Sequence, residues 1–360
     1  MIVFLSFIIF PISKLLACTN VFIYGNGNTA VARTTDYSVS TSMNDGLGVG
    51  LVGESNTADV NSYLPDKSKI PVQWVNKYGY IGYPWKGSPS LVDGINGVGV
   101  YAGLLYLGVC TKYPTYNAED PRPCLGVLNV INYILATSCS VEDALQNLNK
   151  IQFVQNVVPA ITSKESEGLY FLMPLHVVIR DKTGDSAVIE WLDGKTVIYR
   201  DPGRVLTNEP PLDWQQRNAE QYDKVDMRLL PPDWSPVSRF VRAYQIVSHL
   251  PVPESENDAL RTAMSALQSV QAPPGVNEDP TLWESLSDLK NSIYYFLPLY
   301  KFNGAKISGF NPVTSWRTFV LNDILSKRVI PEGFVSAAIK PIAASNIKNV
   351  IILTDRSSID

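Results

Sequence analysis

Histidine, the side chain that enzymes use most often as a general base, is nearly absent from this chain. Only two occur among its 360 residues, His176 and His249. His176 lies within an apolar run and His249 at the end of a helical pattern, and both positions are typical of structural histidines. No G-x-S-x-G sequence occurs either. A Ser-His-Asp triad or a papain-like Cys-His pair is therefore poorly supported.

Signatures of metal sites, phosphate sites and nucleic-acid binding are also missing. The sequence contains no C-x-x-C, no H-E-x-x-H, no P-loop and no acidic loop of calcium-binding spacing. We therefore expect neither a metal nor another cofactor. Charged residues make up only 18% of the chain, the net charge is −4 and no basic block stands out. Nucleic acid is accordingly not an expected partner.

Long apolar runs are confined to the beginning of the chain. Residues 2–10 (IVFLSFIIF) are continuously apolar, and Ala17 stands directly before Cys18. This pattern predicts a signal peptide over residues 1–17, although no Lys or Arg precedes the run. A buried N-terminal strand is the alternative. No later segment approaches the ~20 apolar residues of a membrane helix. We therefore expect one exported domain, periplasmic or secreted, over residues 18–360, without stable membrane insertion.

Cysteines are few. The four are Cys18, Cys110, Cys124 and Cys139. Export would permit disulfide bonds. Cys110 and Cys124 flank a loop rich in Pro and Tyr, and they could close it or remain thiols. The sequence leaves both alternatives open.

The chain does contain many short strand patterns, with helical patterns in pairs between them. Residues 21–24 and 29–33 bracket Gly25–Asn28, which is a strong hairpin signal. Further strands are predicted over residues 175–181, 186–192 and 195–200, with more hairpins over 285–299 and 305–310. Helical spacing occurs over residues 124–138, 140–150, 236–250 and 255–270. Strand blocks that alternate with helix pairs, without a regular βαβ rhythm, favour an α+β layered fold.

Cys18 has one potential base that requires no histidine. Cleavage after Ala17 would place a new α-amino group, with a pKa of ~7.7–8, on the same residue as the thiol. A terminal amine can serve as base for its own side chain. The predicted hairpin returns Arg33 towards Cys18, where a cation would favour the thiolate. Asp36 could hydrogen-bond the amine or the thiol and hold it in place.

Six segments, in the same order, resemble motifs of a known family over nearly the whole chain after residue 17. They are CTNVFIY…TAVARTTDYS, VDGINGVGVYAGLLYL, DKTGDSAVIEWLDGKTVIY, RVLTNEPPLDWQ, LPPDWSPVSRFVRA and TLWESLSDLKNSIYYF. The sequence thereby resembles the choloylglycine hydrolase family of N-terminal-nucleophile amidases, which includes bile salt hydrolases and penicillin V acylases. The likeness is greatest to its Gram-negative-type branch, whose members are exported.

This resemblance implies a fold and a set of site residues. The fold is a four-layer αββα sandwich with antiparallel sheets. Cys18 matches the nucleophile, and Arg33 and Asp36 match the residues that tune and hold it. Asn208 matches the Asn that helps to bind the oxyanion. Arg239 matches the Arg that supports the charge network.

The sequence also departs from the family pattern. Leu105 stands where relatives often have Asn or an aromatic residue, so it offers an oxyanion only its backbone N–H. Tyr106 could fill the aromatic role one position later. Pro232 replaces an expected Gly. The segment between Asn208 and Arg239 is short, where bile salt hydrolases of Gram-positive type carry a tetramer-assembly loop. A homo-oligomer, whether tetramer or dimer, stays an open expectation.

The implied activity is hydrolysis of a linear amide in an N-acyl substrate through a thioester on Cys18. Penicillin V, an acyl-homoserine lactone and a conjugated bile salt are the substrate types considered. The aromatic stretch Tyr78–Trp85 could line the acyl pocket, or form a structural cluster. Two alternatives stay open. Leu15-Leu16-Ala17-Cys18 loosely resembles a lipobox, which would make the chain a lipid-anchored envelope protein without catalysis. The same fold could also serve an acyltransferase.

Overall fold

The computed structural model describes most of the chain after residue 16. The described residues are 17–37, 46–60, 68–85, 88–155, 157–159, 170–274, 279–303, 306–310, 316–326, 330 and 332–339. The predicted signal peptide, residues 1–17, lies outside them except for Ala17.

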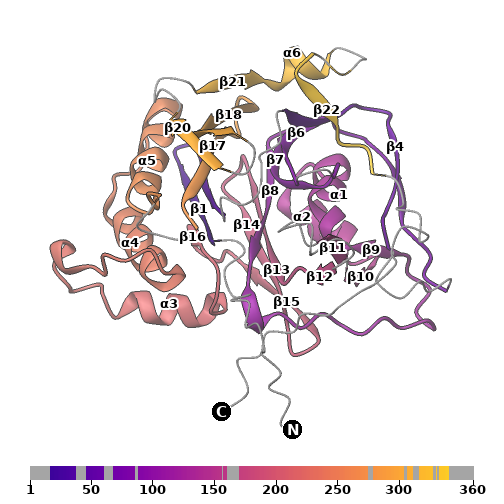
Figure 1. Ribbon diagram of the computed structural model, residues 1–360, viewed down its shortest axis with the longest axis horizontal. Helices are drawn as coiled ribbons and strands as arrows, with labels where there is room; N and C mark the ends of the chain where they lie inside the picture. The colour runs from indigo at the N-terminus through magenta and orange to yellow at the C-terminus, as the bar shows by residue number, and fades with distance from the viewer. Residues whose placement is uncertain are drawn as a thin grey trace, which may run out of the picture.

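Two large sheets form the centre of the molecule (Figure 1). The six-stranded sheet has the order β16 (Val205–Leu206), β1 (Ala17–Gly25), β2 (Asn28–Asp36), β17 (Thr281–Asp288), β18 (Ile293–Pro298) and β21 (Arg317–Val320). The eight-stranded sheet has the order β15 (Lys195–Arg200), β14 (Ser186–Leu192), β13 (Leu175–Asp181), β8 (Val100–Tyr106), β7 (Leu91–Asn96), β6 (Tyr80–Pro84), β3 (Leu47–Gly50) and β22 (Phe334–Ser336). The pairing in these two sheets is antiparallel throughout, except between β22 and β3.

Four small two-stranded sheets decorate this centre. They pair β4 (Ser55–Thr57) with β5 (Gln73–Val75), β9 (Cys124–Gly126) with β10 (Gln152–Val154), β11 (Val157–Pro159) with β12 (Tyr170–Leu172), and β19 (Tyr300–Asn303) with β20 (Lys306–Phe310).

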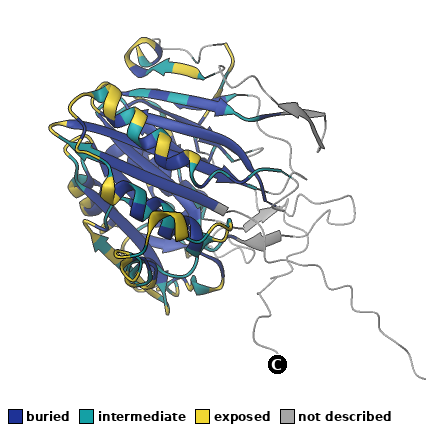
Figure 2. Cartoon of the chain, turned by 90° about the vertical axis from the view of Figure 1, so that its left-hand side faces the viewer, coloured by how far each residue is buried: buried dark blue, intermediate teal, exposed yellow. Residues whose placement is uncertain are grey.

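Helices cover the outer face of each large sheet. The helices are α1 (Val130–Thr137), α2 (Val141–Leu148), α3 (Leu212–Glu220), α4 (Pro236–His249), α5 (Glu256–Gln268) and α6 (Leu321–Leu325). Helices α4 and α5 pack on the sheet of β1 and β2, and α1 packs on β7 and β8 (Figure 1). The resulting order of helices, sheet, sheet and helices confirms the predicted αββα sandwich. Its inner strands are buried, whereas α4 and α5 turn exposed residues outwards (Figure 2).

The first hairpin forms as predicted and sets the position of Cys18. Asn26 and Gly27 have φ angles of 52° and 75°, the left-handed conformation that a tight hairpin turn between twisted strands requires. Gly25 pairs with Asn28, and the register continues to Cys18 opposite Thr35. The turn thus places the beginning of β1 beside the end of β2.

Local signals also explain where the predicted helices begin. The Ser140 hydroxyl accepts a hydrogen bond from the backbone N–H of Asp143 and caps α2. The Ser235 hydroxyl caps α4 in the same way, and Pro236 occupies the first turn, where its missing N–H costs nothing. The predicted helices over 140–150, 236–250 and 255–270 are confirmed within a few residues at their ends.

Three features differ from the sequence predictions. The helical pattern over 124–138 starts with β9 and a short 3-10 helix, Val127–Asn129, so that only its second half is α1. Strand β4 lies at the start of a segment expected to be loop. Helix α3 was not predicted, because its sequence, LDWQQRNAE, has only a weak apolar stripe.

The sequence left open whether Cys110 and Cys124 form a disulfide or remain thiols. Cys110 is a free thiol, so the predicted alternative of a disulfide to Cys124 is not formed.

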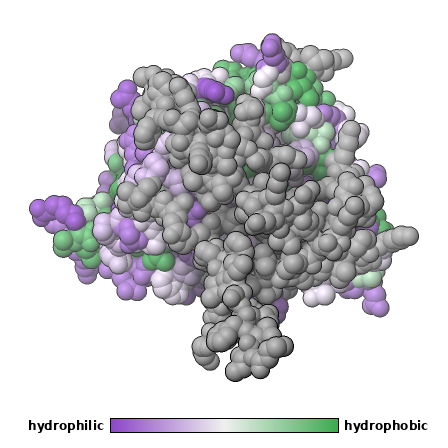
Figure 3. Space-filling model, in the orientation of Figure 1, coloured by the Kyte–Doolittle hydropathy of each residue, from purple (hydrophilic) through white to green (hydrophobic). Residues whose placement is uncertain are grey.

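The flank of α3, α4 and α5 is mainly hydrophilic, whereas hydrophobic residues gather around β21, α6 and β22 (Figure 3). Within the described part of the chain, no helix has the length and hydropathy needed to cross a membrane.

Candidate active site

Cys18 lies in β1, fully buried, with polar partners on both its thiol and its backbone. Its Sγ is 3.5 Å from Nη2 of Arg33. Its backbone N–H donates to Oδ1 of Asn208 over 2.8 Å. The thiol and the backbone nitrogen of one residue are therefore held by two side chains that lie 15 and 190 positions away in the sequence.

Arg33 is fixed by an opening between two strands of the other sheet. The β7–β8 ladder pairs Asp93 with Gly103 and does not extend to the next residues, Val92 and Leu104. Nη1 of Arg33 donates to the carbonyl of Val92 over 2.8 Å, and Nη2 donates to the carbonyl of Leu104 over 2.5 Å. The guanidinium thus bridges both carbonyls where the strands separate.

Gly103 makes room for this guanidinium. A Cβ at position 103 would lie 2.8 Å from the Tyr101 hydroxyl and 3.1 Å from Nη1 of Arg33. Both contacts are closer than normal packing allows, so a larger residue would displace Arg33.

Burial and charge act in opposite directions on the thiol. Burial raises the pKa of Cys18, and it is the larger effect in this structure. The positive charge and the hydrogen bond of Arg33 lower the pKa of Cys18, whereas the negative charge of Asp36 raises it. Arg33 is therefore the main group that favours a thiolate at this position.

Asp36 is the last residue of β2 and pairs with Ala17 of β1. Its Oδ1 accepts a hydrogen bond from the Thr281 hydroxyl over 2.6 Å. Its Oδ2 has no hydrogen-bond partner among the residues that the structure describes and lies 3.7 Å from Nη1 of Arg239. Burial raises the pKa of Asp36 to about 6, against the opposing effect of Arg239. The ladder partner of Asp36, Ala17, is the residue before Cys18.

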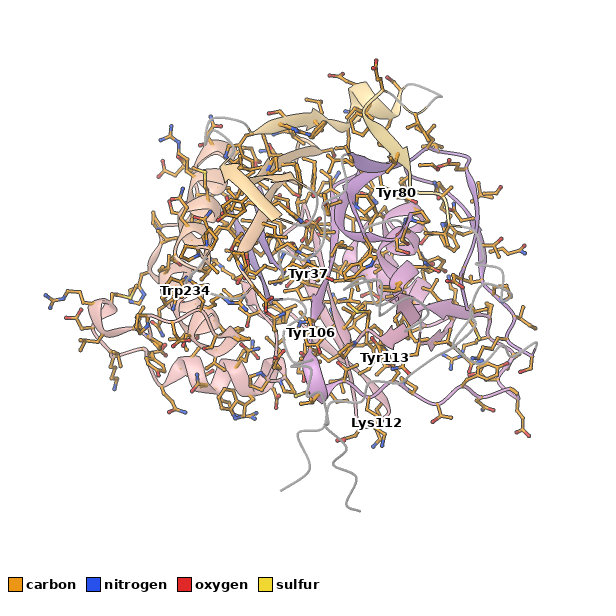
Figure 4. The ribbon with its side chains drawn as sticks, viewed as in Figure 1. Tyr37, Tyr80, Tyr106, Lys112, Tyr113 and Trp234 are labelled. Carbon is orange, nitrogen blue, oxygen red and sulfur yellow. The ribbon has the colours of Figure 1, made fainter. Side chains whose placement is uncertain are left out.

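Arg239 connects the helical layer to the beginning of β1. From α4, its Nη1 donates to the Cys18 carbonyl over 2.7 Å and to the Thr19 hydroxyl over 2.6 Å. Its Nη2 donates to Oδ1 of Asn208 over 2.7 Å. Its Nε donates to the carbonyl of Trp234, which lies on the α4 side of the molecule (Figure 4). The side chain is fully buried, and these four bonds fix its direction.

Asn208 follows β16 and links Cys18 to the other sheet. Its Oδ1 accepts from the Cys18 N–H and from Arg239, and its Nδ2 donates to the carbonyl of Tyr106 over 2.9 Å. This pattern of acceptor and donor contacts assigns the two ends of the amide unambiguously. The structure therefore brings together all five side chains predicted from the family resemblance: Cys18, Arg33, Asp36, Asn208 and Arg239.

Leu105 and Tyr106 lie at the end of β8, between the anchors of Arg33 and Asn208. Leu105 is fully buried and pairs with His176 of β13. The carbonyls on either side of it, of Leu104 and Tyr106, accept from Arg33 and Asn208. Tyr106 is half-buried near the centre of the molecule, between the two helical layers (Figure 4). Both residues thus border the site.

Asp93 belongs to the surroundings of Arg33 and was missed from the sequence. Its carboxylate accepts from the hydroxyls of Ser285 over 2.6 Å and Tyr294 over 3.0 Å. Its negative charge raises the pKa of Arg33 further above its ordinary range. It lies in the segment VDGINGVGVYAGLLYL, which was matched to the family, but the segment gave it no role because two of its partners lie about 200 positions later in the sequence.

An apolar hollow of about 280 Å³, counting its open mouth, adjoins the anchors of Arg33. It is lined by Trp85, Ser90, Leu91, Val92, Leu104, Leu128, Met173 and Leu175. Of the predicted aromatic stretch Tyr78–Trp85, only Trp85 lines it. Tyr80 is buried with its hydroxyl on the Ala337 carbonyl, and Tyr83 stacks on Phe296. The stretch is thus mostly structural, and its last residue borders the hollow.

Among the described residues, no group of three or more His, Cys, Asp or Glu side chains is placed to hold a metal ion. The two arginines near Cys18 donate to backbone carbonyls and to Asn208.

Known proteins resemble this chain in sequence and in fold. The profile of the family described as linear amide C–N hydrolases, choloylglycine hydrolase family, matches residues 18–307. A penicillin V acylase from Pectobacterium atrosepticum is 29% identical over 62% of this chain, which spans 64% of that protein, slightly less than two thirds. A bile salt hydrolase/transferase from Lactiplantibacillus plantarum is 29% identical over 58% of this chain and 69% of its own length.

Solved structures show the same fold. A penicillin V acylase from Agrobacterium tumefaciens superposes with a TM-score of 0.67 at 24% identity, covering 86% of this chain and 88% of its own. A conjugated bile acid hydrolase from Clostridium perfringens superposes with a TM-score of 0.69 at 20% identity, covering 91% and 99%. Since the family profile matches most of the residues from Cys18 onwards, the chain belongs to the choloylglycine hydrolase family of linear amide C–N hydrolases.

Proposed function

We propose that this protein hydrolyses the linear amide bond of an N-acyl substrate, with Cys18 as an N-terminal nucleophile. The proposal rests on one observation, the contacts that Arg33 and Asn208 make with Cys18. Arg33 contacts its thiol and Asn208 accepts from its backbone nitrogen, so that nucleophile and base would sit on one residue.

Acylation begins with the transfer of the thiol proton to the α-amine of Cys18. The thiolate then attacks the amide carbonyl carbon and forms a C–S bond, and the C=O electron pair moves to the oxygen. Asn208 and a backbone N–H, proposed to be that of Leu105, stabilise the oxyanion. When the tetrahedral intermediate collapses, the C–N bond breaks. The α-ammonium of Cys18 gives its proton to the leaving amine, and a thioester remains.

Deacylation reverses these roles with water. The α-amine takes a proton from a water molecule, whose oxygen attacks the thioester carbonyl. The C–S bond then breaks, the carboxylic acid leaves and the thiol is restored. The same two donors stabilise the second oxyanion. Loss of one such donor typically costs ~3–4 kcal/mol of transition-state stabilisation, so Asn208→Ala should slow turnover by about 100- to 1,000-fold.

The proposal requires removal of residues 1–17, because a peptide nitrogen at Cys18 is not a base. Asp36 supports this step, since it pairs with residue 17 in the ladder and its Oδ2 has no hydrogen-bond partner among the described residues. A carboxylate there can receive the α-ammonium that cleavage creates. Cleavage by an export peptidase would combine secretion with activation.

The hollow supports an apolar acyl group. Its lining is apolar apart from Ser90, as in pockets that bind apolar ligands. The relatives named penicillin V acylase and bile salt hydrolase/transferase mark the two classes to compare.

Two other functions, lipid attachment and acyl transfer, have to be distinguished from amide hydrolysis. Lipid attachment at Cys18 would place a diacylglyceryl group on a thiol that is fully buried and hydrogen-bonded by Arg33. Acyl transfer to an amine has support from the relatives named hydrolase/transferase. Product analysis in the presence of a competing amine separates transfer from hydrolysis.

A panel of three amides tests the proposal: penicillin V, an acyl-homoserine lactone and a conjugated bile salt. We expect the processed protein to hydrolyse at least one, with penicillin V fastest. Cys18→Ala should lose at least about 1,000-fold in kcat/KM, because removal of a covalent nucleophile abolishes the pathway. Release of the free amine measures the rate.

Cys139→Ala provides the matched control, since it removes an exposed thiol far in sequence from the site. It should retain full activity. Hydrolysis by Cys18→Ala at the normal rate would refute Cys18 as the nucleophile. Full activity of a protein that retains residues 1–17 would refute the α-amine of Cys18 as the base.

A further inference from the structure

A buried His–Glu pair contacts Thr207, the residue before Asn208. His176 of β13 and Glu190 of β14 are both fully buried, and His176 Nδ1 is 3.0 Å from Glu190 Oε1. His176 Nε2 is 3.0 Å from the carbonyl oxygen of Thr207. The proposed mechanism gives this pair no role.

The partners of the His176 ring define where its protons are. The Thr207 carbonyl can only accept, so Nε2 must carry a proton. Glu190 Oε1 accepts the backbone N–H of Leu212 over 3.1 Å, and Leu212 is the first residue of α3. Nδ1 of His176 faces the same oxygen of Glu190, so the two side chains form a buried hydrogen-bonded pair.

Gln215 of α3 also holds the segment around Asn208, through hydrogen bonds to Thr207, Asn208 and Pro210. The Thr207 hydroxyl donates to Oε1 of Gln215 over 2.7 Å. Nε2 of Gln215, from α3, donates to the carbonyls of Asn208 over 2.6 Å and Pro210 over 2.7 Å. His176 therefore fixes the chain just before Asn208, and Gln215 fixes it just after.

We infer that His176 and Glu190 are positioning residues for Asn208. Glu190 holds the His176 ring, the ring fixes the Thr207 carbonyl, and this contact aims the Asn208 side chain at Cys18. The inference rests on the proposed function, because it assigns the pair a task in the same reaction. Catalytic groups must be held to a fraction of an ångström, and a shift of about 1 Å can cost about 100-fold in rate.

The protonation state can be measured in the unmodified protein. The chain has only two histidines, so a nitrogen-detected NMR spectrum of the rings contains two sets of signals, which His249→Gln assigns. Nε2 of His176 should carry a proton, because it donates to the Thr207 carbonyl. A ring whose Nε2 carries no proton would overturn this contact.

Two double variants that differ by one methylene test the positioning role. In His176→Gln/Glu190→Gln, the amide of the longer introduced side chain can reach the position of Nε2 and donate to Thr207. In His176→Asn/Glu190→Gln, the shorter side chain cannot. We expect kcat to fall by about 10- to 100-fold in the His176→Asn double variant with KM nearly unchanged, and to recover within about threefold of wild type in the His176→Gln double variant.

The outcomes separate this inference from the proposed function. Equal kcat in the two double variants would overturn the positioning role, and His249→Gln should match wild type. The side-chain amide signal of Asn208, identified by its absence in Asn208→Ala, should move in the His176→Asn double variant and stay near its wild-type position in the His176→Gln double variant. This readout needs no turnover, so it decides the inference even if wild type hydrolyses no amide.

Discussion

At the scale of single residues, the site depends on how much positive charge reaches the Cys18 thiol. Burial alone raises the pKa of Cys18 and keeps the sulfur protonated. Arg33 opposes this effect from 3.5 Å, and its own direction is fixed by two backbone carbonyls. The thiol of Cys18 is therefore tuned by one guanidinium that the opposite sheet holds in place.

Removal of that guanidinium should raise the pKa of the thiol. An opposite charge within about 4–6 Å lowers a pKa by about one to three units, so Arg33→Gln should shift the pH midpoint of Cys18 alkylation upwards by that amount. Peptide mass spectrometry after iodoacetamide treatment at a series of pH values measures the midpoint. Arg180→Gln is the control, since Arg180 is equally buried but lies over the Phe22 ring rather than at the sulfur. An unchanged midpoint in Arg33→Gln would contradict the assigned role.

Only part of the site follows from the sequence without a family likeness. A hairpin at Gly25–Asn28 brings Arg33 to Cys18, and local turn chemistry predicts that contact. Asn208 and Arg239 contact Cys18 from 190 and 221 positions away, and no local pattern encodes such contacts. The six matching segments identified these two residues, but no segment pointed to the pair of His176 and Glu190.

At the scale of elements, the strong signals are turns and caps. The first hairpin was predicted from its turn residues, and helices α2, α4 and α5 from the helical spacing of their apolar residues. In the structure, a left-handed turn or an N-cap hydroxyl defines where each of them begins. Helix α3 and strand β9 were not predicted, because their residues are placed by tertiary contacts. Glu190 on the first N–H of α3 is one such contact.

The cap of α2 provides a test at this scale. Ser140→Ala removes the hydroxyl that accepts from the Asp143 N–H and should lower the free energy of unfolding by about 1 kcal/mol. Urea unfolding followed by circular dichroism measures the change. Ser265→Ala, at an exposed position within α5, should change it by less than about 0.5 kcal/mol. Equal effects of the two substitutions would show that the cap does not stabilise α2.

At the scale of the whole molecule, acidic groups buried beneath the helical layer make stability depend on pH. Glu284 of β17 is 3% exposed, and its Oε1 has no hydrogen-bond partner among the described residues. Burial, together with the charge of Asp36, raises the pKa of Glu284 from 4.5 to about 7. The pKa of Asp36 itself is raised to about 6. The folded state thus binds more protons than the unfolded state between about pH 4 and pH 7.

This difference in proton binding between the folded and unfolded states determines how stability changes with pH. Stability must fall as pH rises through this window, because the folded protein has to give up protons that it binds more tightly. Glu284→Gln removes the cost of ionisation and should raise the free energy of unfolding by about 2 kcal/mol at about pH 8, with little change at about pH 4.5. Urea unfolding at the two pH values measures it, with the exposed Glu142→Gln as control. A gain of the same size at both pH values would exclude ionisation of Glu284 as the cause.

The central claim is that a chain beginning at Cys18 carries the acyl group on that residue during turnover. Intact-mass spectrometry of the exported protein, quenched in acid within seconds of mixing with penicillin V, tests it most directly. We predict a chain that starts at Cys18 and carries one phenoxyacetyl group, which peptide mapping places on Cys18 and which is absent from Cys18→Ala. A hydrolytically active protein whose chain retains residue 17, or whose Cys18 carries two fatty acyl chains, would contradict the account.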